Sequence, residues 1–137
     1  MSDQQPVIDE FRANDGRVGG HLAAMSLLLL NTLGAKSGRR RTTPLTYVPD
    51  GERYIVIAAY AGAPSHPAWY HNLLAYPDDV TVEVGAREVP VVVRVLMGDE
   101  REAAYRHFAD SAPQVLGYQE RTTRQFPVVA LEPSIRG

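Results

Sequence analysis

The chain has 137 residues, of which 45% are hydrophobic and 22% charged, with a formal net charge of -2 and no cysteine. That length fits one domain with a core of its own. The near-neutral charge argues against a nucleic-acid-binding surface, and the absence of thiols excludes disulfides, thiolate metal sites and cysteine nucleophiles.

Residues 1–25 are interpreted as an N-terminal helix and loop extension. Val7, Ile8 and Phe11 fall on one side of one or two helical turns, and a glycine-rich stretch follows. The polar, acidic N-terminus does not resemble a signal peptide. We therefore expect a cytoplasmic protein that could touch a membrane surface through this segment, with residues 26–137 as its single main domain.

The first half of that domain carries three strand patterns. Residues 26–32 and 54–60 are apolar enough for buried strands, and residues 43–48 alternate between two faces. The Pro-Asp-Gly-Glu sequence at 49–52 predicts a tight turn between the second and third strands.

The second half predicts three more strands, at residues 80–84, 88–97 and 127–131, with Pro90 at an edge or bulge. A helix is expected from Pro67 to about Tyr76, capped by Ser65 or His66. A second helix is expected within residues 98–112, with Asp99 as its cap and an apolar face of Ala104, Tyr105 and Phe108. About six strands and two main helices predict a mostly β, α+β fold, a small antiparallel barrel with flanking helices, although a two-sheet sandwich also fits.

Residues 34–45, "GAKSGRRRTTPL", carry four of the 14 Lys and Arg residues within six positions. Cationic side chains beside hydroxyl groups and free backbone N–H groups suit a phosphate or a carboxylate-rich ligand. The glycine spacing is not that of a Walker loop. A solvated hairpin loop explains the same residues without a ligand.

Residues 61–74, "AGAPSHPAWYHNLL", join a strand to a helix through small residues and prolines. Small residues let a flat ring approach the backbone, whose N–H groups can bond the polar edge of that ring. Trp69 could wall such a pocket and Asn72 could bond a polar group. The alternative places Trp69 simply in the core.

The remaining candidates for chemistry are few. The four histidines show no metal-ligand spacing, and no nucleophile elbow occurs. Tyr118, in the segment "GYQERTTRQFPVVALEP", offers a phenolic hydroxyl near the last strand. If the protein is an enzyme, a cofactor should carry the chemistry.

Four segments in this order, "FRANDGRVGG", "LLLLNTLGAKSGRRRTTPL", "GAPSHPAWYHNLLAYPDDVTVEV" and "YQERTTRQFPVVALEP", resemble the deazaflavin-dependent nitroreductase and quinone reductase family of actinobacteria. Members are oxidoreductases with an FMN-binding-like split β-barrel that use reduced coenzyme F420. The resemblance covers roughly residues 8–133. It implies hydride transfer from the reduced deazaflavin to an electron-poor acceptor, such as a quinone, an enone or a nitroaromatic compound, without a metal.

The resemblance also implies residue roles. Tyr118 matches a tyrosine on the acceptor side and is the expected catalytic residue. The residues expected to hold the cofactor are Lys36, Ser37, Arg39, Arg41, Thr42, Thr43, Pro44, Ala59, Tyr60, Ala61, Gly62, Ala63, Pro67, Trp69 and Asn72. Arg39 and Arg40 are expected to meet the glutamate tail of the cofactor.

Three positions depart from the family pattern. Val115 stands where many nitroreductases of this kind have tyrosine, Ala59 stands where many have serine, and Tyr60 stands where relatives often have another residue. Nitroimidazole activity is therefore not carried over. An FMN-binding split-barrel reductase and a non-catalytic F420 carrier remain alternatives, and the protein could be a monomer or a homodimer.

Overall fold

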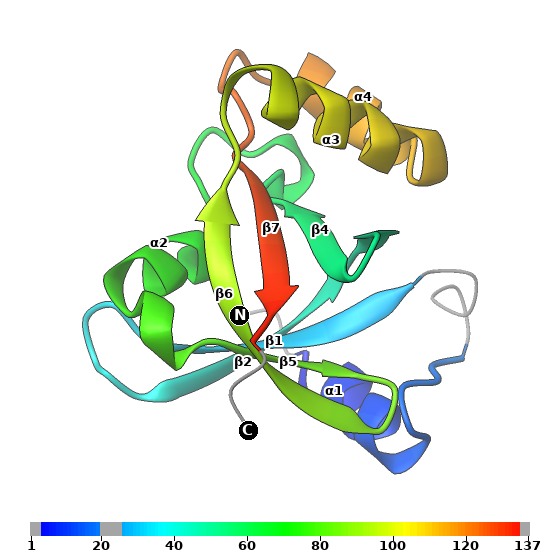
Figure 1. Cartoon of the computed structure of the whole chain (residues 1–137), viewed down its shortest axis with the longest axis vertical. Coiled ribbons are helices and arrows are strands. Elements are labelled where there is room, and N and C mark those ends of the chain that lie inside the picture. The colour runs from blue at the N-terminus through cyan, green and yellow to red at the C-terminus, as the bar shows by residue number, and fades with distance from the viewer. Residues whose placement is uncertain (1–3, 20–25, 135–137) are drawn as a thin grey trace.

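The structure, a computed structural model, describes residues 4–19 and 26–134. Its strands form one antiparallel sheet in the order β2-β1-β5-β6-β7-β4-β3, which curls into a half-barrel with helices outside it (Figure 1). The expected mostly β, helix-flanked split barrel is thus confirmed, with seven strands where about six were expected. The sheet is continuous and is not a two-sheet sandwich.

The elements run in the following order along the chain: α1 (Gln5–Ala13), β1 (Leu27–Leu33), β2 (Arg40–Thr46), β3 (Val48–Asp50), β4 (Arg53–Ile57), the 3-10 turn η2 (Tyr60–Gly62), α2 (Ala68–Ala75), the 3-10 turn η3 (Pro77–Asp79), β5 (Thr81–Val84), β6 (Arg87–Val95), α3 (Gly98–Ser111), α4 (Gln114–Glu120) and β7 (Val128–Pro133).

The long strand β6 joins the two halves of the barrel. Its first part pairs with β5, up to Pro90 opposite Thr81, and its second part pairs with β7 from Val91 onward. Pro90 has no N–H to give to a ladder, so a position where the strand changes partner tolerates it. Its carbonyl accepts a hydrogen bond from Ser134.

Three predictions of local structure were wrong in detail. The strand expected at 43–48 is divided at Tyr47 into β2 and β3, and β2 begins already at Arg40 because residues 40–43 pair with the end of β1. Helices α2 and α3 begin after Pro67 and Met97, and neither has a side-chain cap. Helix α4 was not predicted; Val115, 1% exposed, anchors it in the core.

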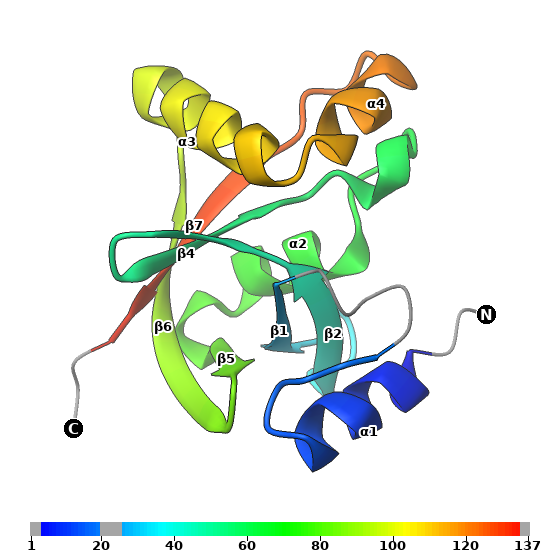
Figure 2. The ribbon, with the colours of Figure 1, turned by 90° about the vertical axis from the view of Figure 1, so that its right-hand side faces the viewer.

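Helices cover the barrel at both ends. Helices α3 and α4 lie together over β4 and β7, whereas α1 lies beside β1 and β2 at the opposite end (Figure 2). Phe108, Val115 and Phe126 belong to the hydrophobic cluster under α3 and α4. The barrel interior holds a second cluster, which includes Trp69 and Leu73 of α2.

Helix α1 turns its apolar residues toward the sheet. Ile8 and Phe11 are 5% and 1% exposed and pack with Leu29 of β1. These apolar side chains of α1 are therefore buried and do not support the expected contact with a membrane. The rest of the N-terminal segment, residues 1–3 and 20–25, lies outside the described ranges. No helix in the described part of the chain is long and apolar enough to cross a bilayer.

Candidate functional site

A pocket of ≈ 820 Å³ opens between the basic turn after β1, the η2 segment and the start of α2. It brings together predicted residues from separate parts of the sequence: Lys36, Ser37, Arg41, Thr42, Thr43, Tyr60, Trp69 and Asn72. Ser65, His66 and His71 line it too and were not predicted to do so. The lining residues, all within the described ranges, include Lys36, Arg41 and two histidines but no Asp or Glu, so the pocket suits an anionic ligand.

Residues 34–39 form a tight turn that presents Lys36 and Ser37. The Gly34 N–H donates to the Arg39 carbonyl and the Gly38 N–H to the Gly34 carbonyl, both at 2.8 Å. Gly38 has φ +69°, which favours glycine. A Cβ on Gly34 would lie 2.6 Å from the Ser37 hydroxyl, so a larger residue there would displace it.

Asn72 supports this turn from α2. Its side-chain oxygen accepts a hydrogen bond from the Ala35 N–H at 2.9 Å, and its amide nitrogen lies 3.5 Å from the Thr32 hydroxyl. Asn72 is 8% exposed, so the bond to Ala35 is shielded from water. Trp69, on the same helix, is 7% exposed and both lines the pocket and packs into the barrel core.

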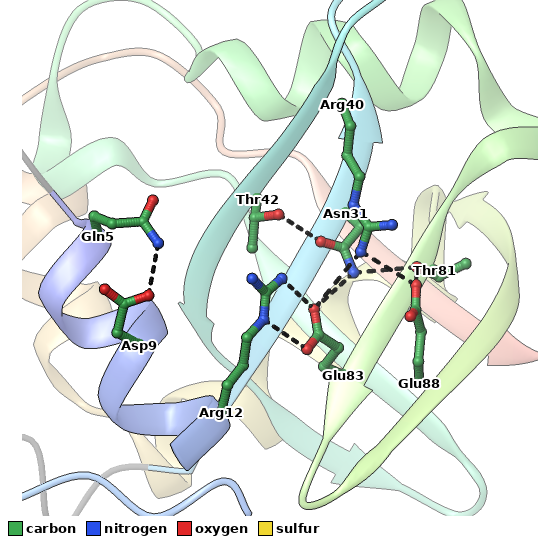
Figure 3. Close-up of polar contacts among 9 residues, drawn as sticks. All are labelled: Gln5, Asp9, Arg12, Asn31, Arg40, Thr42, Thr81, Glu83 and Glu88. Carbon is green, nitrogen blue, oxygen red and sulfur yellow. Dashed lines mark hydrogen bonds and ion pairs between the residues drawn. The ribbon is translucent and has the colours of Figure 1, made fainter.

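A polar network joins Thr42 of β2, Asn31 of β1 and Glu83 of β5 (Figure 3). The Thr42 hydroxyl donates to Asn31 at 2.6 Å, and the Asn31 amide donates to Glu83 at 3.0 Å. Arg12 of α1 closes the chain with two hydrogen bonds to Glu83, at 3.0 and 2.8 Å. The hydrogen bond from Arg12 is the main reason that the pKa of Glu83 is lowered.

Arg40 belongs to this network and not to the pocket. Its guanidinium lies 3.4 Å from Glu88 and 3.9 Å from Glu83, and Thr81 donates to the same Glu88 oxygen at 2.7 Å (Figure 3). Alternation along β2 places Arg40 and Arg41 on opposite faces. The Thr42 side chain also points to the face of Arg40, although Thr42 is among the residues that line the pocket.

The segment of residues 58–63, called here the arch, borders the pocket through Tyr60. Tyr60 has φ +49° and Gly62 has φ +83°. A Cβ on Gly62 would lie 2.5 Å from the Tyr118 carbonyl oxygen, so only glycine lets the arch approach α4 this closely. The side chain of Ala61, another predicted cofactor-binding residue, lies outside the described part of the structure.

Arg124, on the irregular segment before β7, binds the arch from behind. Its guanidinium donates to the carbonyls of Ala58, Ala59 and Ala63 at 3.0, 2.8 and 3.0 Å. It also lies 2.7 Å from Nδ1 of His66. Burial, followed by the charges of Arg124 and His71, lowers the pKa of His66, so this imidazole is neutral at pH 7.

The other predicted residues lie around the pocket without lining it. Arg39 and Pro44 belong to the turn and to β2, Pro67 precedes α2, and Ala59, Gly62 and Ala63 form the arch. Tyr118 lies on α4, half-buried against the cluster under α3, with the Arg121 guanidinium 5.6 Å from its ring centre. In the described ranges, no group of three or more His, Cys, Asp or Glu side chains is placed to hold a metal ion.

Sequence reasoning missed the roles of Arg124 and His66. Arg124 received no role in the sequence analysis, and its partners lie more than 50 positions away along the chain. No residue type in the sequence marks these partners, because they are mainly backbone carbonyls. His66 had been considered only as a helix cap and as a metal ligand.

Comparison with known proteins identifies relatives along most of the chain. The family model described as "F420H(2)-dependent quinone reductase" matches residues 5–133. An F420H(2)-dependent quinone reductase of Mycobacterium tuberculosis is 38% identical over 125 residues, which are 88% of this chain and 83% of the relative.

Solved structures agree with this match. An F420-H2 dependent reductase, FDR-A, is 36% identical with a TM-score of 0.72, covering 83% of this chain and 100% of its own. A structure described as a domain-swapped dimer is 35% identical with a TM-score of 0.74, covering 94% of both chains.

Proposed function

The chain belongs to the F420H(2)-dependent quinone reductase family, and from this premise we propose that its pocket binds reduced F420 and presents it to a quinone or a similar electron-poor acceptor. The observation that carries the proposal is the pairing, within one ≈ 820 Å³ pocket, of a cationic turn with an aromatic wall. The cationic turn suits a phosphate with a glutamate tail, and the aromatic wall suits a flat heterocycle.

The residues of the pocket fit the two ends of such a cofactor. Lys36 and Arg41 bind phosphate and carboxylate oxygens through charge-assisted hydrogen bonds, and Ser37 adds a neutral donor. Trp69 and Tyr60 flank the ring. Of the two arginines expected to meet the glutamate tail, Arg40 pairs with Glu88 on the other face of the sheet. Arg39 is therefore the one that binds the tail.

When bound, reduced F420 supplies the hydride. The protein orients ring and acceptor against each other and excludes water, which removes most of the entropy of encounter from the reaction barrier. Backbone N–H groups of the arch and polar groups of the pocket stabilise negative charge that develops on the acceptor oxygen. Acceptors of this kind are quinones, activated enones and nitroaromatic compounds.

The relative described as a domain-swapped dimer supports a homodimer for this chain, with a monomer as the alternative. Light scattering of the purified protein at several concentrations distinguishes the two states. A concentration-independent monomer mass would remove the dimer from the proposal and leave the pocket unchanged.

Parallel titrations with F420 and FMN test the cofactor assignment. We expect saturable binding of F420 and much weaker binding of FMN, because FMN lacks the glutamate carboxylates that the cationic turn favours. The preference should shrink as salt is added, since exposed ionic contacts are screened. Tight binding of FMN with no binding of F420 would overturn the proposal.

A further inference from the structure

Arg124 makes an unusually large number of contacts to a single short segment. Its guanidinium bonds three arch carbonyls, those of Ala58, Ala59 and Ala63, and stacks at 4.8 Å on the Phe126 ring. A guanidinium carries five donors in a fixed plane, so one side chain can hold several carbonyls in a defined arrangement. Burial lowers the pKa of Arg124, but a guanidinium remains charged at neutral pH.

These bonds fix the direction of the neighbouring N–H groups. In a trans peptide the C=O and the following N–H point in opposite directions. Because the Ala59 carbonyl points at Arg124, the Tyr60 N–H points away from it, and Tyr60 lines the pocket. Tyr60 also has φ +49°, which is a strained conformation for a residue other than glycine. The bonds from Arg124 to the carbonyl of Ala59, directly before Tyr60, and to that of Ala63, three residues after it, hold the arch in this conformation.

The same guanidinium determines the tautomer of His66. A guanidinium has no acceptor, so at 2.7 Å the Nδ1 atom of His66 must be the acceptor and carry no proton. The ring proton of the neutral imidazole then resides on Nε2. His66 lines the pocket, whereas Arg124 is not among the lining residues, so Nε2–H is the group that remains for a ligand.

We propose that Arg124 is the positioning residue of the ring end of the pocket: it fixes the Tyr60 N–H and the His66 Nε2–H as two donors for a ring carbonyl oxygen. This inference rests on the proposed function, because the oxygen belongs either to the deazaflavin ring or to the quinone acceptor. Arg124 acts without touching either ligand.

The first test needs no cofactor. Nitrogen-15 NMR of the imidazole side chains in the free protein should show His66 as a single Nε2–H tautomer, with Nδ1 unprotonated. In Arg124→Gln the preference should disappear. Arg106→Gln, on the exposed face of α3, is the matched control and should leave the His66 signals unchanged. An Nδ1–H tautomer in the natural protein would overturn the inference.

The second test compares two replacements of His66 that differ in where they place a donor. The amide nitrogen of Gln lies near the position of Nε2, whereas that of Asn lies near Nδ1. A lost neutral hydrogen bond is worth about threefold to tenfold in affinity or rate. We expect His66→Asn to lose that factor and His66→Gln to recover most of it.

The readout identifies the ligand that carries the oxygen. A weaker F420 dissociation constant, measured by fluorescence titration, assigns it to the deazaflavin. An unchanged dissociation constant with a lower kcat/KM for menadione assigns it to the acceptor. Arg124→Lys keeps the charge but cannot bond all four partners, so it should lose the same factor as His66→Asn. It replaces Arg124→Gln in these measurements if Arg124→Gln does not fold.

Two kinds of failure are distinguishable. If the natural protein binds no F420, the proposed function fails, while the tautomer measurement still tests Arg124. If F420 binds and is turned over normally by both His66 variants and by Arg124→Lys, the inference fails and the proposed function stands.

Discussion

The side-chain oxygen of Asn72 accepts a hydrogen bond from the N–H of Ala35 at 2.9 Å, which ties the aromatic wall of the pocket to its cationic turn. The two residues lie 37 positions apart in the sequence, and their bond is largely shielded from water. The turn is therefore held in place by the helix that also carries Trp69. Loss of this bond should alter both the cationic turn and the aromatic wall of the pocket.

Replacing Asn72, which carries no charge itself, should weaken cofactor binding. Asn72→Ala leaves the Ala35 N–H without its partner, which we expect to cost about 1–3 kcal/mol of stability and to weaken F420 binding. Asn72→Asp keeps the acceptor but adds a negative charge to an anion site, so it should fold better than Asn72→Ala and bind F420 worse than the natural protein. Thermal unfolding and fluorescence titration measure the two effects. Equal affinity in all three proteins would mean that the turn does not depend on α2.

The neighbouring residues Arg40 and Arg41 should differ sharply in their effect on F420 binding. Arg41→Ala, like Lys36→Ala, removes a charged donor from the pocket and should weaken binding about tenfold or more at low salt. Arg40→Ala is the matched control because its side chain pairs with Glu88 behind the sheet. We expect a change of about twofold or less for it. A large loss in Arg40→Ala alone would place the cofactor on the other face of β2.

The Arg12–Glu83 pair should make stability depend on acidic pH. The pKa of Glu83 is lowered below its ordinary value of 4.5, chiefly by the hydrogen bond from Arg12. The pair therefore contributes stability that is fully present above pH 4.5 and is lost as the pH falls through the lower, folded-state pKa. Glu83→Gln should lose about 1–3 kcal/mol at neutral pH and show a shallower loss in acid. Denaturant unfolding from pH 7 to 3 checks this, and parallel curves for both proteins would contradict it.

Replacements of Tyr60 and Tyr118 should show which of the two tyrosines contacts the acceptor. Tyr60 is 59% exposed and lines the pocket, whereas Tyr118 packs on α4 against the core. We expect Tyr60→Ala to lower kcat/KM for menadione several-fold. Tyr118→Phe keeps the ring and its packing, so the family-based assignment of its hydroxyl to the acceptor requires a lower kcat with unchanged F420 affinity. If instead turnover is unchanged in Tyr118→Phe and lowered in Tyr60→Ala, the acceptor lies at the mouth formed by Tyr60.

Local patterns were sufficient to predict most strands and much of the pocket lining. Runs such as that of β4 are apolar enough to be buried wherever they lie, and the turn after β1 concentrates charge in a few positions. These patterns did not predict where a side chain points when that depends on how two strands pair. The segment between the expected strands at 26–32 and 43–48 was taken as a loop, but pairing of β2 with β1 extends to Arg40. This pairing turns Arg40 and Thr42 toward Glu88 and Asn31.

The role of Arg124 was beyond the reach of sequence reasoning for a different physical reason. Its partners are mainly backbone carbonyls, which every residue has, so no side-chain type marks them as the other half of a contact. Helix α4 was missed because a glycine at its centre and few apolar residues weaken its periodic pattern, while a single buried residue, Val115, anchors it.

The central claim, that this chain is an F420-dependent reductase of quinone-like acceptors, is tested most directly by the anaerobic time course of reduced F420 oxidation with menadione in excess. The account predicts many cofactor equivalents oxidised per protein molecule, at a rate proportional to protein concentration. The Lys36→Ala and Arg41→Ala variants should reach the same rate only at higher cofactor concentration. Oxidation that stops at one equivalent, or that proceeds no faster than without protein, would contradict the account and indicate a protein that only carries the cofactor.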